Sequence, residues 1–182
     1  MKKIILVAFM AVFTSSAFAQ LMTSRMTTVK NNHNSKIWFD FGLGGFSGDV
    51  NDTGLGVDLG FRWTEKFGES FCWDILKLSA QTDTKSFTKS LNVQLKTGPR
   101  YVSPVLFGSQ SLYANANIGY GLFTDNTDAH GLAWEIGAGI NITPRFSAGI
   151  VYNSQHYSME IYKEEEKKYN VGYIALRLAL GL

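Results

Sequence analysis

Residues 131–153 read GLAWEIGAGINITPRFSAGIVYN, two alternating segments that are joined by Thr143, Pro144 and Arg145. Alternate residues of the first segment are apolar, namely Leu132, Trp134, Ile136, Ala138, Ile140 and Ile142. The residues between them are mostly small or polar, namely Ala133, Glu135, Gly137, Gly139 and Asn141. This strict alternation predicts a β-strand whose two faces meet different surroundings. The segment is longer than the roughly 5–6 residues of most globular strands and matches the roughly 9–11 residues that cross a bilayer at a tilt.

The two faces of this segment differ in bulk as well as in polarity. The apolar face is continuous and bulky, as expected of a surface against lipid. The polar face carries glycine, asparagine and glutamate, which fit the inside of a narrow tube. Thr143, Pro144 and Arg145 predict a tight turn, since proline fixes φ and cannot donate to a ladder. The second segment alternates again from Phe146, so the stretch predicts a hairpin of two membrane-crossing strands.

The rest of the chain repeats this pattern, and eight strand-like runs are predicted. They span residues 37–46, 54–63, 71–81, 90–102, 112–123, 131–142, 146–158 and 169–182. In the third run the alternation changes phase near Leu76, which indicates a β-bulge. In the fourth run Pro99 predicts that the strand bends or stops. An open sheet in a bilayer would leave edge N–H and C=O groups unpaired, so the pattern predicts an eight-stranded antiparallel transmembrane β-barrel with up-and-down order.

The N-terminal residues read as a targeting segment. Lys2 and Lys3 precede an apolar run at 4–13 and a small-residue cleavage site that ends at Ala19, so residues 1–19 predict a secretory signal peptide. Residues 20–36 are polar and lack periodicity, and they are expected to form a flexible lead-in to a barrel domain at 37–182. Cys72 is the single cysteine of the chain, so an internal disulfide is excluded.

Several charged residues fall on the face that is predicted to point inward. They are Asp40, Asp58, Arg62, Lys96, Arg100, Glu135 and Arg177, which Asp74 could join. One interpretation is an ion pathway, and the other is a salt-bridge network that plugs the lumen. We favour the plug, because an eight-stranded barrel is just wide enough for its own side chains and buried charges must pair. Arg62, Arg100 and Arg177 are expected to pair with Asp40, Asp58 or Glu135.

The aromatic residues of the apolar face are expected to form two belts at the membrane borders. One belt would contain Trp63, Trp73, Tyr101 and Phe146, and the other Tyr120 and Trp134. A soluble, lipocalin-like barrel with an internal ligand is the alternative fold. The inward Asp, Arg and Glu residues argue against an apolar cavity of that kind.

The chain from residue 36 to its end, with its signal peptide, resembles the small outer-membrane β-barrel proteins of Gram-negative bacteria, which share the architecture of the OmpA membrane domain and OmpX. Leu178, Leu180 and Leu182 resemble the terminal-strand signal that the barrel-assembly machinery reads, although that signal most often ends in Phe. The resemblance implies a monomer in the outer membrane, in contact with its lipid and lipopolysaccharide. No cofactor is expected, and a net charge of +2 gives no indication of a nucleic-acid partner.

Gln155, His156, Tyr157 and Ser158 contain a His-x-Ser element that resembles the one in PagL-type lipid A 3-O-deacylases. In that family the Ser is the nucleophile, the His is the base and a Glu orients the His. Here Met159 stands where the family has Asn, and the acid would come from Glu160 or from residues 164–166. The other interpretation is that His156 and Ser158 are polar residues at a membrane–water border. The histidines show no metal-ligand spacing.

Two functions therefore remain open. The first is a non-enzymatic barrel that acts as a structural or surface-binding scaffold, with loops at 47–53, 82–89, 124–130 and 159–168 facing outward. The second is a lipid ester hydrolase in which Ser158 attacks and His156 acts as the general base.

Overall fold

The computed structural model describes residues 35–48, 54–83, 91–123, 130–161 and 165–182, and for 157–161 and 165–169 it describes the backbone alone. The predicted signal peptide and residues 20–34 lie outside this part, as do most of the predicted loops at 47–53, 82–89 and 124–130 and residues 162–164 of the fourth. No helix among the described residues is long and apolar enough to cross a membrane.

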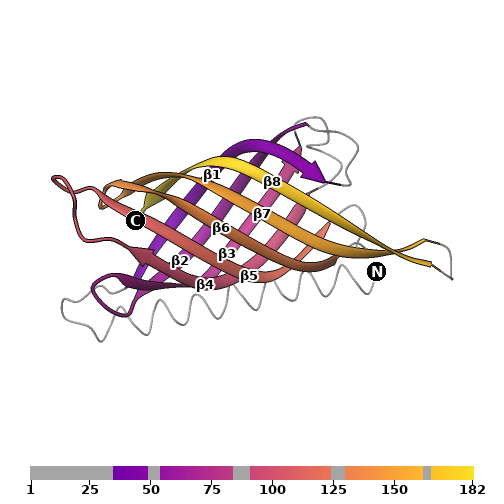
Figure 1. The fold of residues 1–182 in the computed structure, drawn as a ribbon, viewed down its shortest axis with the longest axis horizontal. Coiled ribbons are helices and arrows are strands. Elements are labelled where there is room, and N and C mark those ends of the chain that lie inside the picture. Colours follow the sequence, from indigo (N-terminus) through magenta and orange to yellow (C-terminus); the bar gives the residue numbers. More distant parts are fainter. Residues whose placement is uncertain (1–34, 49–53, 84–90, 124–129, 162–164) are drawn as a thin grey trace. The chain divides into compact units, whose positions relative to one another are not determined.

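Eight antiparallel strands close into a barrel in sequence order (Figure 1), so the predicted up-and-down architecture is confirmed. The strands are β1 (Ser35–Gly48), β2 (Leu55–Lys66), β3 (Phe71–Asp83), β4 (Asn92–Val102), β5 (Ser111–Phe123), β6 (His130–Thr143), β7 (Phe146–Ile161) and β8 (Glu165–Gly181). We call the end that carries the β2–β3, β4–β5 and β6–β7 connections the turn end, and the opposite end the loop end.

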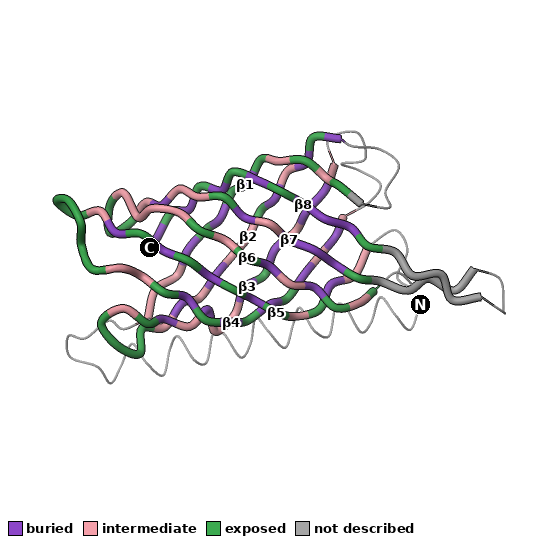
Figure 2. Tube along the Cα trace, viewed as in Figure 1, coloured by how far each residue is buried: buried purple, intermediate pink, exposed green. Residues whose placement is uncertain are grey.

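Burial alternates along the strands, as the two-faced pattern requires (Figure 2). On β5, for example, Leu112 and Ile118 are exposed, whereas Asn115 and Asn117 are buried. The apolar residues therefore lie on the outer surface and the polar residues lie inside, the reverse of a soluble protein. This arrangement suits a wall with hydrocarbon outside and packed polar groups within.

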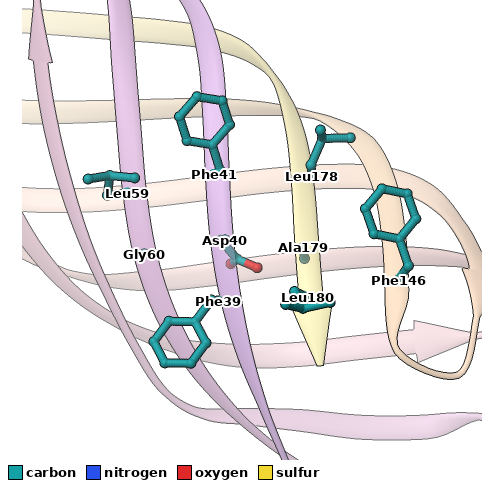
Figure 3. Close-up of a pocket in the computed structure, with 9 residues that line it drawn as sticks. All are labelled: Phe39, Asp40, Phe41, Leu59, Gly60, Phe146, Leu178, Ala179 and Leu180. Carbon is teal, nitrogen blue, oxygen red and sulfur yellow. The ribbon is translucent and has the colours of Figure 1, made fainter. Parts of the chain in front are cut away.

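The outer surface includes a shallow apolar hollow on the wall formed by β1, β2, β7 and β8 (Figure 3). Phe39 and Phe41 on β1 and Leu178 on β8 stand around it, and Phe146 lies at its side. Asp40 sits between the two phenylalanines in sequence, yet its carboxylate is buried and bonded inside the barrel. Neighbouring residues of one strand thus meet two different environments.

A bulge interrupts β3 where the sequence predicted one. The pairing of β3 with β4 shifts register between Asp74 and Lys77, and the pairing with β2 shifts opposite Trp63 and Thr64. Asp74 and Lys77 are both buried although they are three residues apart. The extra residue of the bulge shifts the inward positions by one residue, so that they fall on odd-numbered residues after it.

The sequence allowed the fourth strand to stop or to bend at Pro99, and the stop is wrong; the bend stays a prediction. β4 continues to Val102, and Pro99 pairs with Trp73 of β3. On the other side of β4, the pairing with β5 is interrupted at Gly98 and Pro99 and resumes in the same register at Arg100. Proline lacks an N–H group, so it can sit where one ladder is locally open.

The prediction that residues 159–168 form a loop is also wrong, because most of these residues belong to the sheet. β7 extends to Ile161 and β8 begins at Glu165, with Met159 paired to Lys167. Glu160 and Ile161 likewise pair with Glu166 and Glu165, and isoleucine favours strands. At the other end of the chain β1 begins at Ser35, so the last two residues of the predicted lead-in belong to the barrel wall.

Gly44 and Gly45 on β1 provide a matched test of barrel closure. A Cβ on Gly44 would lie 1.9 Å from the carbonyl oxygen of Ile174 and 2.6 Å from the Cα of Ala175, whereas a Cβ on Gly45 would meet nothing within 4 Å. Gly44→Ala is expected to lower the free energy of unfolding by about 1–3 kcal/mol, because β1 and β8 must separate to relieve the clash. Gly45→Ala should change it by less than about 0.5 kcal/mol. Urea titrations in detergent micelles measure both values, and equal midpoints would contradict the close approach.

Candidate functional site

Charged side chains fill the barrel interior over the middle of its length. The buried acids are Asp40, Asp58, Asp74 and Glu135, and the buried bases are Arg62, Lys77, Lys96, Arg100 and Arg177. They come from β1, β2, β3, β4, β6 and β8. A charge this far from water is stable only when it is paired and hydrogen-bonded.

Glu135 on β6 is the centre of this cluster. Its carboxylate accepts hydrogen bonds from the Lys77 ammonium of β3, from Lys96 Nζ of β4 at 3.1 Å and from Arg177 Nη1 of β8 at 3.0 Å. Asn115 Nδ2 donates to it at 3.1 Å. One carboxylate thus joins side chains from several sides of the barrel, and these side chains meet across the lumen.

Two further acids share the cations around Glu135. Arg177 also donates to the carboxylate of Asp58, so its guanidinium bridges two acids. Lys77 Nζ lies 3.8 Å from Asp40, whose other oxygen accepts from Arg62 Nη2 at 3.2 Å. The pairs are therefore linked into one network, in which loss of any member leaves a buried partner without compensation.

Asp74 on β3 is the centre of a second set of polar contacts in the interior. Arg100 binds it with two nitrogens, Nε at 3.0 Å to Oδ1 and Nη2 at 3.0 Å to Oδ2, the fork geometry that arginine favours. Thr64 Oγ1 donates to the same carboxylate at 2.7 Å. The Arg100 guanidinium also lies over the Tyr113 ring, 4.7 Å from its centroid.

Neutral amides continue the network on the other side of Glu135. Gln94 Oε1 accepts from Lys96 Nζ at 2.8 Å and from Asn153 Nδ2 at 2.7 Å. Gln94 Nε2 donates to Gln155 at 3.0 Å. The interior is therefore occupied by interlocking polar side chains along the middle of the barrel, and this arrangement ties the wall strands to one another.

The interior network is only partly the one that the sequence indicated. All seven predicted inward charges are buried, but Arg100 pairs with Asp74 instead of with Asp40, Asp58 or Glu135. The sequence analysis did not find Lys77, because it lies directly after the bulge, where the inward phase changes. Counting an extra residue at the bulge would have placed Lys77 inside.

The predicted belt residues lie toward the two ends of the barrel. Trp63, Trp73, Tyr101 and Phe146 lie near strand termini at the turn end, and Tyr120 and Trp134 lie toward the loop end. Trp73 Nε1 donates to Thr97 Oγ1 at 2.9 Å, and the Tyr120 hydroxyl lies 2.5 Å from His130 Nδ1. Their location at membrane borders stays a prediction.

The His-x-Ser element lies at the loop end of β7. His156 is exposed and pairs with Asn170 of β8. The backbone of Ser158 pairs with His130 of β6 and with Lys168 of β8. The Ser158 side chain lies outside the described part, as do those of the four acids that could orient the histidine, so the catalytic assignment stays a hypothesis. Among the described residues, no group of three or more His, Cys, Asp or Glu side chains could hold a metal ion.

A closed eight-stranded barrel with an apolar outer wall and an ion-paired interior defines the class of transmembrane β-barrels. The sequence matches the model of the outer membrane protein beta-barrel domain over residues 5–180. The chain therefore belongs to this family of outer-membrane proteins. No match was found among curated protein sequences.

Solved structures with the same architecture include two that resemble this one over most of its length. The crystal structure of Neisserial surface protein A has a TM-score of 0.59 and 10% sequence identity, covering 81% of this chain and 96% of that chain. The crystal structure of the outer membrane enzyme PagL has a TM-score of 0.52 and 17% identity, covering 79% of this chain and 98% of that chain. At these identities the likeness shows the fold alone.

Removing the central charge tests the interior network. Glu135→Gln keeps the size of the side chain but leaves Lys77, Lys96 and Arg177 with less compensation, so the free energy of unfolding should fall by roughly 3–5 kcal/mol. Glu69→Gln, in the exposed β2–β3 turn, is the control and should change it by less than about 0.5 kcal/mol. Urea unfolding in micelles measures both variants. A Glu135→Gln barrel as stable as the wild type would show that these pairs carry little energy.

Proposed function

We propose that this protein is a non-enzymatic outer-membrane barrel that acts as a structural or surface-binding scaffold with a plugged polar lumen. The observation that carries the proposal is the set of bonds that Glu135 makes to Lys77, Lys96 and Arg177 across the interior. In this proposal these side chains occupy the space that a water column would need. A rigid, filled frame leaves the loops as the parts that can vary and bind.

The proposed orientation is taken from outer-membrane barrels in general, in which one end faces the periplasm and the other faces outward. In this proposal the signal peptide is removed after Ala19, the turn end faces the periplasm and the loop end faces outward. The protein is a monomer in contact with outer-membrane lipid and lipopolysaccharide. Leu178, Leu180 and Leu182, all exposed on the outer surface, are the residues that the barrel-assembly machinery would read.

A plugged lumen predicts that the barrel does not conduct ions. The purified barrel, reconstituted in planar lipid bilayers, is expected to give no reproducible single-channel steps, because the charged side chains bind one another and leave no continuous path. Heat-modifiable migration on gels confirms that the sample is folded before the recording. Reproducible steps from the folded protein would contradict the plug and favour an ion pathway.

The competing function is hydrolysis of a lipid ester by Ser158 with His156 as the general base. What favours it is position, because both residues lie at the loop end of β7 and His156 is exposed. The hypothesis needs both side chains on one face of the wall, as residues two apart in a regular strand have. The hypothesis also needs an acid at the far side of the imidazole.

Mass spectrometry of lipid A separates the two functions. A scaffold predicts identical lipid A from cells that express the wild type, Ser158→Ala or Ser154→Ala, where Ser154 is a control on the same strand. An enzyme would instead remove one acyl chain in the wild type and in Ser154→Ala, but not in Ser158→Ala. That second pattern would overturn the scaffold proposal.

A further inference from the structure

The connection between β4 and β5 is unusually apolar for a turn. Residues 103–110 read SPVLFGSQ and contain no charged residue. Val105, Leu106 and Phe107 follow one another and are 63%, 51% and 79% exposed. The other two turns at the same end each carry an exposed charge, Glu69 in one and Arg145 in the other. A run of exposed apolar residues of this kind marks a surface that meets something other than water.

This turn is held in a defined conformation by hydrogen bonds. The Leu106 N–H donates to the Gln110 carbonyl and the Gln110 N–H to the Phe107 carbonyl, both at 2.8 Å. Gly108 adopts a φ of 58°, which the reversal needs and which glycine tolerates without strain. Ser109 Oγ donates to the Ile142 carbonyl of β6 at 3.1 Å. The apolar side chains are therefore presented by a fixed hairpin.

The apolar surface of this turn continues the outer wall of the barrel. Tyr101 at the end of β4 and Leu112 at the start of β5 are about half exposed, and they flank the turn on the wall. Phe71 of β3 pairs with Tyr101, and Phe67 in the adjoining β2–β3 turn is exposed. The lipid-facing surface of β3, β4 and β5 thus runs into the turn through aromatic and aliphatic residues.

We propose that the β4–β5 turn is a membrane anchor, whose Val105, Leu106 and Phe107 insert into the lipid interface at the turn end of the barrel. The partner is the lipid surface itself, because the turn is continuous with the wall that the family places in a membrane. Aromatic and aliphatic side chains partition into this layer, whereas charges stay at its aqueous side. The anchor lies on one side of the barrel, since the β6–β7 turn presents Arg145 instead.

A spin label at the tip of the turn tests the anchor. Phe107→Cys, made with Cys72→Ser so that one thiol remains, is labelled with a nitroxide and reconstituted in phosphatidylethanolamine–phosphatidylglycerol vesicles. Both leaflets of these vesicles have the same composition, so the result does not depend on the direction of insertion. An inserted label collides more often with oxygen, which concentrates in lipid, than with a water-soluble nickel complex.

Two further labels calibrate the measurement. Ile118→Cys, on the exposed outer face of β5, reports lipid, and Glu69→Cys, in the charged β2–β3 turn, reports water. The proposal expects the Phe107 label to resemble the Ile118 label. A Phe107 label as accessible to nickel as the Glu69 label would overturn it, and so would a label shielded from both reagents, which would indicate a protein contact. Heat-modifiable migration establishes that each labelled variant is folded.

Discussion

The hydrogen bonds between β1 and β8 are the contact on which the barrel depends. They run from the pair Trp38 and Gly181 to the pair Gly48 and Val171. Without them two strand edges would expose unpaired N–H and C=O groups to hydrocarbon, where each group costs several kcal/mol. Gly44 allows the two strands to approach closely at their centre. Closure by eight strands also sets a diameter that side chains alone can fill.

The narrow interior explains why it is charged and paired. Inward side chains are removed from both lipid and bulk water, so Glu135 keeps its charge only because Lys77, Lys96 and Arg177 surround it. An apolar interior would avoid this cost, but it would make both faces of each strand apolar. The strand could then slip by one residue with little penalty, whereas a polar inward face fixes the register.

The two ends of the barrel differ in the elements that project from them. At the turn end the connections are two to eight residues long, and the apolar β4–β5 turn continues the lipid-facing wall. At the loop end β7 and β8 pair with each other beyond their last described partners on β6 and β1, which are His130 and Gly48. The two ends of the barrel are therefore structurally different.

The sequence by itself determined the eight strands, the closed barrel and the direction of most inward charges, because alternation is a property of each strand. It also located the bulge near Leu76. It did not give the partner of Arg100, the role of Lys77 or the length of the β7–β8 pairing. Those features depend on register, on the phase change at the bulge and on which strands lie side by side. Only the tertiary structure decided which charged side chains form ion pairs. Residues from different strands become neighbours only when barrel closure fixes the stagger between the strands.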